Sequence, residues 1–398
     1  MLLGLSGLGA EPQPLGELPG TVRATVNSIA FRSDGRTFAI PVDSRGTVGL
    51  FRIKPERKAA VLTEAESNRI ATLVSELDAD EFATREEATR ELAGFGARIE
   101  PQLKAARKAT SSPEVRVRLG RVLAGIAEDE ADRFEELGRI EGRGAGRFLI
   151  VRSLEFSPDE SLLLEAGSDR GLAGARGHIR LLDAGTHKVL RQELVDGEVQ
   201  DAKFSPDGRR IYAALDDEVG VWDTATLKRQ ATLPAHSGEI YSLAVSPDGR
   251  WLACAGVPQT VSIWDLEASR QVRLLEGFGD SVGHLDFSPD GRHLACASED
   301  GTLTVWDMTT GKRLHSLRGH GGVEVWSVTY SPDGRTIATG DESGGAVLWD
   351  AGSGDVLARL GGRAAHGCHS EFSPNGRYLL TAAGYGKVQL WKWPMQDD

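Results

Sequence analysis

Four segments of the sequence combine residue types that could carry out chemistry. Residues 340–345 (GDESGG) place a serine among glycines and acids, a setting in which a serine can act as a nucleophile. Residues 142–146 (GRGAG) are as rich in glycine as loops that bind phosphate. Neighbouring carboxylates, at 216–218 (DDE) and 299–300 (ED), could act as acid and base or bind an ion.

None of these segments has the context that its chemistry requires. The serine lies in a turn between two strands of a repeat, and the glycine-rich segment joins two strands rather than a strand and a helix. Both carboxylate groups lie in turns, where aspartate commonly bonds to the local backbone. The nine histidines form no HExxH motif and no close Cys/His cluster, so we predict no metal site, no cofactor and no enzymatic activity. His236, His320 and His366 occupy repeat positions and are interpreted as structural.

Composition narrows the class of protein and its partners. With 46 Lys and Arg against 58 Asp and Glu, the net charge of −12 makes nucleic acid an unlikely partner. No apolar run approaches the roughly 20 residues that span a bilayer, so a soluble protein is predicted. Cys254 and Cys296 read as small apolar core residues, which favours a cytoplasmic location. Export is the alternative, if Met1–Ala10 is part of a leader.

Most of the chain consists of sequence repeats, and these repeats must position the residues described above. An FSPDG-like segment occurs seven times, at 31–35, 156–160, 204–208, 245–249, 287–291, 330–334 and 372–376. The last six copies are spaced by 48, 41, 42, 43 and 42 residues. Proline and glycine at these positions favour a tight reversal, and short alternating apolar runs flank it, so four strands per unit are predicted.

These repeats resemble a WD-repeat β-propeller. The resemblance rests on the period, on a Gly-His pair at 319–320 and on Trp-Asp pairs that end four of the units. It implies an all-β, seven-bladed β-propeller with an inserted small α-helical subdomain. Structural roles in the repeats are predicted for Trp222, Asp223, Trp264, Asp265, Ser298, Asp300, Trp306, Asp307, His320, Trp349, Asp350 and Trp391.

The resemblance also implies a hydrogen-bonded set of His, Ser or Thr, Asp and Trp in each complete unit. One unit has Phe278 in place of the histidine. The next has His320 and Trp349, but Ser343 stands at the position expected for the aspartate. We therefore predict that no unit has the complete set and that the blades depend more on apolar burial.

Ring closure and an insertion complete the predicted organisation. Residues 14–20 (PLGELPG) resemble a fourth strand and should complete the last blade, since a propeller must cover its sheet edges. The alternative is a disordered tail. The first repeat spacing is about 83 residues too long, and Thr63–Ala131 has the apolar spacing of about four helices.

Helix-start signals mark this insertion. Capping boxes are predicted at Thr63 with Glu66 and at Thr84 with Glu87, and a helix should begin after Ser112. The segment resembles HEAT-like helical segments of bacterial WD-repeat proteins. Residues 134–142 read as the fourth strand of blade one, which places the insertion in the loop between its third and fourth strands. The resemblance implies that this loop opens on the bottom face of the propeller. The predicted domains are 1–13 (tail), 14–54 (closing strand and blade one), 55–131 (helical insert), 132–394 (remaining blades) and 395–398 (tail).

Two surfaces are predicted to bind partners. The resemblance places the second residue of each first strand at the top of the channel: Asn27, Arg152, Gln200, Tyr241 and Trp326. In the insert, a basic edge could dock an acidic partner: Arg107, Lys108, Arg116, Arg118 and Arg121. The alternatives are that the aromatics cover strand edges and that the basic residues pair with the acidic helix.

The sequence therefore predicts a non-catalytic scaffold or adaptor for protein or peptide partners. The alternative is an enzyme or ligand-binding propeller that uses its central channel. That alternative requires a polar pocket with perturbed carboxylates, and a channel lined by small apolar residues would contradict it.

Overall fold

The computed structural model describes residues 12–18, 22, 26–55, 62–131, 133–142, 149–171, 174–361, 367–383 and 387–393. The possible leader at Met1–Ala10, His366 and most of the glycine-rich segment 142–146 lie outside these described residues. The chain forms two compact units. One comprises Met1–Arg52 with Glu136–Asp398, and the other comprises Ile53–Glu135.

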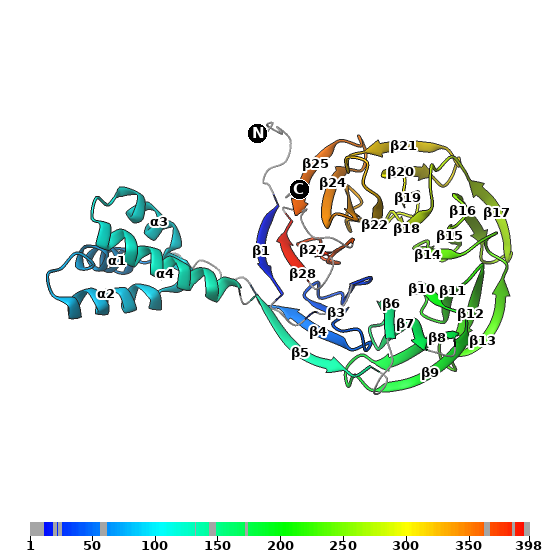
Figure 1. The fold of residues 1–398 in the computed structure, drawn as a ribbon, viewed down its shortest axis with the longest axis horizontal. Coiled ribbons are helices and arrows are strands. Elements are labelled where there is room, and N and C mark those ends of the chain that lie inside the picture. The colour runs from blue at the N-terminus through cyan, green and yellow to red at the C-terminus, as the bar shows by residue number, and fades with distance from the viewer. Residues whose placement is uncertain are drawn as a thin grey trace. The chain divides into compact units, whose positions relative to one another are not determined.

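The larger unit is a ring of seven four-stranded antiparallel sheets, so the predicted seven-bladed propeller is confirmed. In Figure 1 the first strands, such as β10 and β14, face the centre of the ring and the fourth strands run around its circumference. In each blade the sheet order runs from the inner strand to the outer strand. Blade one has β2 (Ala30–Phe31), β3 (Thr37–Pro41), β4 (Val48–Ile53) and β5 (Phe134–Ile140). Blade two has β6 (Leu149–Phe156), β7 (Leu162–Gly171), β8 (Gly174–Asp183) and β9 (Val189–Asp196). Blade three has β10 (Val199–Phe204), β11 (Arg210–Leu215), β12 (Glu218–Asp223) and β13 (Lys228–Leu233).

The remaining four blades follow the same order. Blade four has β14 (Ile240–Val245), β15 (Trp251–Gly256), β16 (Val261–Asp265) and β17 (Arg270–Leu275), and blade five has β18 (Val282–Phe287), β19 (His293–Ser298), β20 (Thr302–Asp307) and β21 (Arg313–Arg318). Blade six has β22 (Val325–Tyr330), β23 (Thr336–Asp341), β24 (Gly345–Asp350) and β25 (Val356–Gly361), and blade seven has β26 (Cys368–Phe372), β27 (Tyr378–Ala383), β28 (Lys387–Lys392) and β1 (Gln13–Glu17).

The SPDG segments form the predicted turns between first and second strands. In blade three, Asp207 accepts hydrogen bonds from the Ser205 hydroxyl and from the backbone N–H of Arg209. Gly208 adopts φ +70°, a conformation that a side chain disfavours. Side-chain bonding and glycine together fix the reversal that sends each chain back along the blade.

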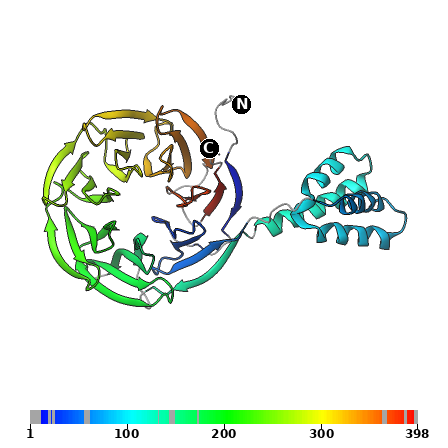
Figure 2. The same ribbon diagram turned by 180° about the vertical axis from the view of Figure 1, so that it is seen from behind.

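The ring closes by pairing the two ends of the described chain. Strand β1 lies antiparallel to β28, with Gln13 opposite Lys392 and Glu17 opposite Gln389. In Figure 1 and Figure 2 the two strands lie side by side, blue against red. This is the closing strand that the sequence predicted, although the strand itself ends at Glu17.

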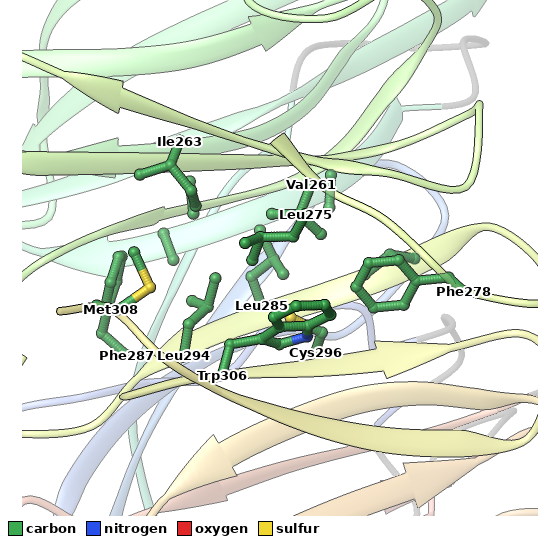
Figure 3. Packing of buried hydrophobic residues seen from close by; sticks show 14 residues of the cluster. Val261, Ile263, Leu275, Phe278, Leu285, Phe287, Leu294, Cys296, Trp306 and Met308 are labelled. Carbon is green, nitrogen blue, oxygen red and sulfur yellow. The ribbon is translucent and has the colours of Figure 1, made fainter. Parts of the chain in front are cut away.

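Neighbouring blades are held together by apolar side chains that lie between their sheets. Figure 3 shows the cluster between blades four and five, where Val261 and Leu275 face Leu285, Leu294 and Trp306. Burying one such side chain contributes about 1.5–3 kcal/mol. The prediction that apolar burial holds the blades together agrees with these clusters, which recur around the ring.

The prediction that no unit has a complete polar set is wrong for blade six. His320 lies between Asp341 and Thr339, with Nδ1 2.7 Å from Asp341 Oδ2 and Nε2 2.7 Å from Thr339 Oγ1. The indole N–H of Trp349 also donates to Thr339 Oγ1, at 2.8 Å. The aspartate is the last residue of β23 rather than a turn residue, and Ser343, where it was expected, donates to it.

Blade five matches its sequence interpretation, because Phe278 takes the place of the histidine. The Phe278 ring packs against Trp306 with a centroid separation of 5.8 Å. Asp300 accepts a hydrogen bond from the backbone N–H of Gly279, and the Trp306 indole donates to Thr304. The blade thus replaces one polar contact by ring packing.

The helical unit contains α1 (Glu64–Glu76), α2 (Phe82–Gly94), the short 3-10 helix Gly96–Ile99, α3 (Glu100–Ala109) and α4 (Pro113–Ala131). The capping box of Thr63 with Glu66 is confirmed, and Ser112 accepts from the backbone N–H of Val115. The predicted box at Thr84 is wrong, because α2 already begins at Phe82. Among the described helices, none is long and apolar enough to cross a membrane.

These helices lie between β4 and β5 in the chain, the loop in which they were predicted. Their core comprises the buried side chains of Ile70, Leu73, Leu77, Leu92, Ile99, Leu103 and Leu119. The unit spans 53–135, against the 55–131 expected for the insert. Its position on the bottom face of the propeller stays a prediction.

Candidate binding site in the central channel

The first strands of all seven blades surround a central cavity of about 800 Å³. Five of these strands carry a register shift beside a residue that lines the cavity, as at Tyr241 between Ile240 and Ser242 in β14. Such a bulge turns a side chain out of the regular pleat. The shifts lie at or beside cavity-lining residues, which are Arg152, Gln200, Tyr241, Gly283 and Trp326.

The structure brings together the five residues that the sequence assigned to the top of the channel. All of them line this cavity: Asn27, Arg152, Gln200, Tyr241 and Trp326. Gly283 and Cys368 occupy the corresponding positions in blades five and seven. Their role in binding a partner stays a prediction.

We call the end of the channel at which the first strands begin the rim. Trp326 is 43% exposed there, and its indole N–H donates to Glu324 at 3.0 Å. Gln200 donates to Glu239 at 2.7 Å, across neighbouring blades. Burial, together with repulsion from Glu324 and Asp280, raises the pKa of Glu299. The rim therefore combines an exposed aromatic ring with a negative potential.

Charged side chains also project into the channel interior. Glu155, Lys203, Asp286 and Glu371 each stand directly before the aromatic residue that ends a first strand. Together with Asp201, whose Oδ1 lies 3.4 Å from the Lys203 ammonium group, we call them the interior cluster. Four different blades contribute to it, so only ring closure brings its members together.

Burial perturbs the acids of the interior cluster. Removal from water raises the pKa of Glu155 and of Asp286 to about 7, and that of Glu371 to about 8. Burial alone would lower the pKa of Lys203, but the carboxylates of Asp201, Glu155 and Glu371 outweigh it and raise this pKa. The lysine is therefore charged, and the carboxyl groups compete for it.

Some members of the cluster have a structural role. Glu155 accepts the backbone N–H of Phe204 at 2.7 Å, and Asp286 accepts that of Tyr330 at 2.7 Å. Asp201 accepts the N–H of Leu243 at 2.9 Å. In each case the acceptor belongs to one blade and the donor to the next, so these bonds join neighbouring inner strands.

Two histidines complete the interior. The rings of His284 and His369 meet edge to face with centroids 5.5 Å apart, and His284 Nδ1 lies 3.1 Å from the carbonyl oxygen of Val328. Burial lowers the pKa of His284 to about 4 and that of His369 to about 3, so both are neutral near pH 7. Within the described parts of the chain, no three His, Cys, Asp or Glu residues group as metal ligands.

The interior cluster was not predicted, although the sequence carries a signal for it. A charged residue directly precedes the closing aromatic in four first strands, and in three of them the residue before it is apolar. The channel is therefore polar and holds perturbed carboxylates, as the alternative of a ligand-binding propeller required.

The basic edge predicted on the insert is only partly exposed. Arg107, Lys108, Arg116 and Arg121 lie on the surface of α3 and α4. Arg118 was predicted as a fifth contact, which is wrong, because its side chain is 4% exposed. Its guanidinium group contacts Glu86 and Glu114, each at 2.6 Å, and so joins α4 to α2.

Arg118→Ala should destabilise the helical unit by about 2 kcal/mol, because it removes packed methylenes and both ion pairs while the partner carboxylates can turn to water. Arg121→Ala, an exposed change on the same helix, should stay within about 0.5 kcal/mol. Amide hydrogen exchange of α4 in the full-length protein would measure both. Equal protection of α4 in the two variants would contradict the structural role of Arg118.

The family comparison agrees with the blade geometry. Residues 227–265, 269–307 and 311–350 match the WD domain, G-beta repeat. Each matched segment begins at or just before the outer strand of one blade and continues with three strands of the next, which links the blades. The protein is thus a seven-bladed β-propeller that contains WD40 repeats.

Two curated relatives are proteins named U3 small nucleolar RNA-associated protein 18 homolog. The human protein is 35% identical over 108 residues, which cover 26% of this chain and 18% of the relative. The mouse protein is 32% identical over 106 residues, with the same coverage. The chain thus matches less than a fifth of the length of these relatives. Both are eukaryotic, so they do not support the bacterial type that the sequence resemblance indicated.

Proposed function

We propose that the protein is a non-catalytic interaction scaffold that binds a segment of a protein partner at the rim. The observation that carries this proposal is the exposure of Trp326, 43%, at the mouth of the central channel. Exposed tryptophans near the centre of a rigid face are frequent hot spots of protein interfaces. WD40 propellers are suited to this role because their blades hold such a face rigid.

The acidic residues of the rim indicate which kind of partner segment it binds. Glu239 and Glu299 line the channel, and Glu324 holds the Trp326 indole. A negative rim favours a positively charged partner and speeds its association at low salt. The proposed partner is therefore a segment that carries basic residues.

Affinity capture from the native cell tests this proposal. Trp326→Ala should lose most of the partners that the unaltered protein captures, because the aromatic anchor is removed. Phe82→Ala is the matched control: its ring is 64% exposed, but it lies on α2 of the helical unit. Partners retained by Trp326→Ala and unaltered protein alike, or the absence of any enriched partner, would overturn the proposal.

A second contact is proposed on the helical unit. Four exposed basic side chains, on the surface of α3 and α4, form the part of the predicted edge that the structure leaves accessible: Arg107, Lys108, Arg116 and Arg121. This edge suits an acidic partner. With a basic segment at the rim and an acidic one here, the protein would act as an adaptor. The likeness of these helices to HEAT-like segments is part of the same proposal.

The relatives support a second candidate function, membership of an RNA-containing complex, because their name associates them with a small nucleolar RNA. This candidate opposes the expectation that nucleic acid is not a partner. The same captures, repeated with and without ribonuclease, separate the two: RNA-dependent partners would favour the complex. A reducing compartment such as the cytoplasm also stays a proposal, supported by three buried free cysteines.

A further inference from the structure

The interior cluster has more negative than positive groups. Among the described residues that line the channel, six are acids and two, Arg152 and Lys203, are basic. Within the interior cluster itself, Lys203 is the one cation among four carboxyl groups, while His284 and His369 beside it are neutral. The excess of carboxyl groups in the channel therefore favours the binding of a second cation.

Glu371 is the member of the cluster best placed to meet such a cation. Its counterparts Glu155 and Asp286 each accept a backbone N–H from the following blade. Among the described residues, the Glu371 side chain has no corresponding hydrogen bond, yet it lines the cavity. Its side chain is half-buried in the channel wall, and its carboxyl group accepts no hydrogen bond from the part of the chain that the structure describes.

We propose that the channel takes up one arginine or lysine side chain of a protein partner, which the carboxylates of Glu371, Glu155 and Asp286 bind. This inference rests on the proposed function, because the partner segment must first lie across the rim. The cavity, at about 800 Å³, is large enough for one such side chain with some water. The acidic rim and the exposed Trp326 ring would attract the cation on its way in.

The ionisation of the cluster agrees with this proposal. Burial and mutual repulsion raise the pKa of Glu371 to about 8, and burial raises those of Glu155 and Asp286 to about 7. In the empty channel, protons thus neutralise part of the excess charge at pH 7. An entering guanidinium or ammonium group would replace them, so binding would release on the order of one proton near pH 7.

All groups that face the cluster take part in this exchange. They come from β6 (Arg152 and Glu155), β10 (Asp201 and Lys203), β18 (His284 and Asp286) and β26 (His369 and Glu371), and Glu239 and Glu299 line the cavity from outside these strands. The neighbouring strands β14 and β22 contribute uncharged side chains, among them Tyr241 and Ser327. The carboxyl groups lose their protons between about pH 6 and 9, while the histidines are neutral throughout this range. Cation binding should therefore strengthen as the pH rises.

A pair of short peptides tests the proposal on the full-length protein. The probes are acetyl-Gly-Arg-Gly-amide and its citrulline counterpart, which has nearly the same shape but no charge. Isothermal titration calorimetry should show the arginine peptide binding about tenfold more tightly, the difference expected for one partly solvated ion pair. Its affinity should rise about tenfold from pH 6 to pH 8.5, and titrations in two buffers should reveal the released proton. The corresponding lysine peptide tests the ammonium group.

Two variants change the charge of the cluster in opposite directions. Glu371→Gln should weaken arginine binding about tenfold and reduce its pH dependence. Lys203→Met removes the competing cation and should strengthen binding by a similar factor. Because the two effects have opposite signs, a general loss of folding cannot mimic them. Glu267→Gln, an exposed change on the loop after β16, is the neutral control.

Equal binding of the arginine and citrulline peptides, or no binding of either, would overturn the proposal. Heat from calcium chloride at these carboxylates without heat from either basic peptide would do the same, since it would assign the site to a metal ion. The proposed function is judged separately. If Trp326→Ala loses its partners while the peptides show no charge preference, the rim binds partners but the channel takes no cation.

Discussion

Replacing Trp349 by alanine should lower the free energy of unfolding by about 3–5 kcal/mol, the range for deleting a large buried aromatic side chain. This residue is 1% exposed and packs in the cluster that joins blades five and six. Its indole N–H also bonds Thr339, which in turn contacts His320. The substitution therefore removes apolar contacts and leaves a buried polar set with one partner missing.

Blade six supplies its own control. Trp326→Ala removes the same side chain from β22, where it is 43% exposed, and should cost less than about 1 kcal/mol. Trp349→Phe keeps most of the ring but loses the N–H donor, so an intermediate cost of about 1–2 kcal/mol is expected. Denaturant unfolding of the three variants provides the comparison. Similar losses for Trp349→Ala and Trp326→Ala would contradict the role of the buried set.

Raising the pH from 7 to 9 should destabilise the propeller by on the order of 2 kcal/mol through its channel carboxyl groups. The pKa values of Glu155 and Asp286 are raised to about 7, and that of Glu371 to about 8, first of all by burial. A carboxyl group with a raised pKa in the folded protein stabilises the fold fully below its unfolded pKa, near 4. This contribution is lost as the pH rises through the folded value.

The histidines act at the other end of the pH range. The lowered pKa values of His284 and His369, about 4 and about 3, mean that their contribution is present above about pH 6.5 and is lost as the pH falls. Between about pH 4 and 6.5 the two contributions therefore oppose each other, and above pH 6.5 only the loss from the carboxyl groups remains. Melting temperatures across this range test the expectation.

Glu371→Gln separates the channel from the rest of the protein. It removes one ionisation, so the loss of stability above pH 7 should become smaller, while the exposed control Glu267→Gln should behave like the unaltered protein. At pH 9 the Glu371→Gln variant should be the more stable of the two. An unchanged dependence of stability on pH in this variant would show that the interior cluster does not cause the loss of stability above pH 7.

Much of the propeller could be predicted because its signals are local. The SPDG turns depend on residues within five positions, and the strands that flank them form the predicted four-strand units. The capping box at Thr63 succeeded for the same reason. The prediction of a capping box at Thr84 was wrong because α2 begins without a side-chain cap, so no capping residue marks its true start.

The polar contacts were harder to predict because they depend on side-chain direction. In blade six the aspartate that contacts His320 is Asp341, at the end of a strand, whereas blade five has Asp300 in the turn two positions later. Alignment of the two units therefore assigns the role to Ser343. Which position reaches the histidine is decided by how the hairpin ends, and only the folded blade shows this.

The interior cluster depends on distance along the chain. Glu155 and Glu371 meet the same lysine because the ring returns on itself, and no periodicity within one repeat reports such a meeting. Conversely, the charged residues near Arg118 in the sequence suggested that its side chain is exposed. Its burial follows from the packing of α2 against α4, which sequence spacing alone does not specify.

The closing strand also sets the order of events during synthesis. Gly16 bonds the side chain of Gln389, which is 373 residues later in the chain. At about 5–20 residues per second, a ribosome needs roughly 20 to 75 s to deliver that partner. Until then β1 has no edge to join, and the seventh blade cannot form. The newly made ring thus stays open for most of its synthesis, a period in which a chaperone or a neighbouring chain could pair with the waiting strand.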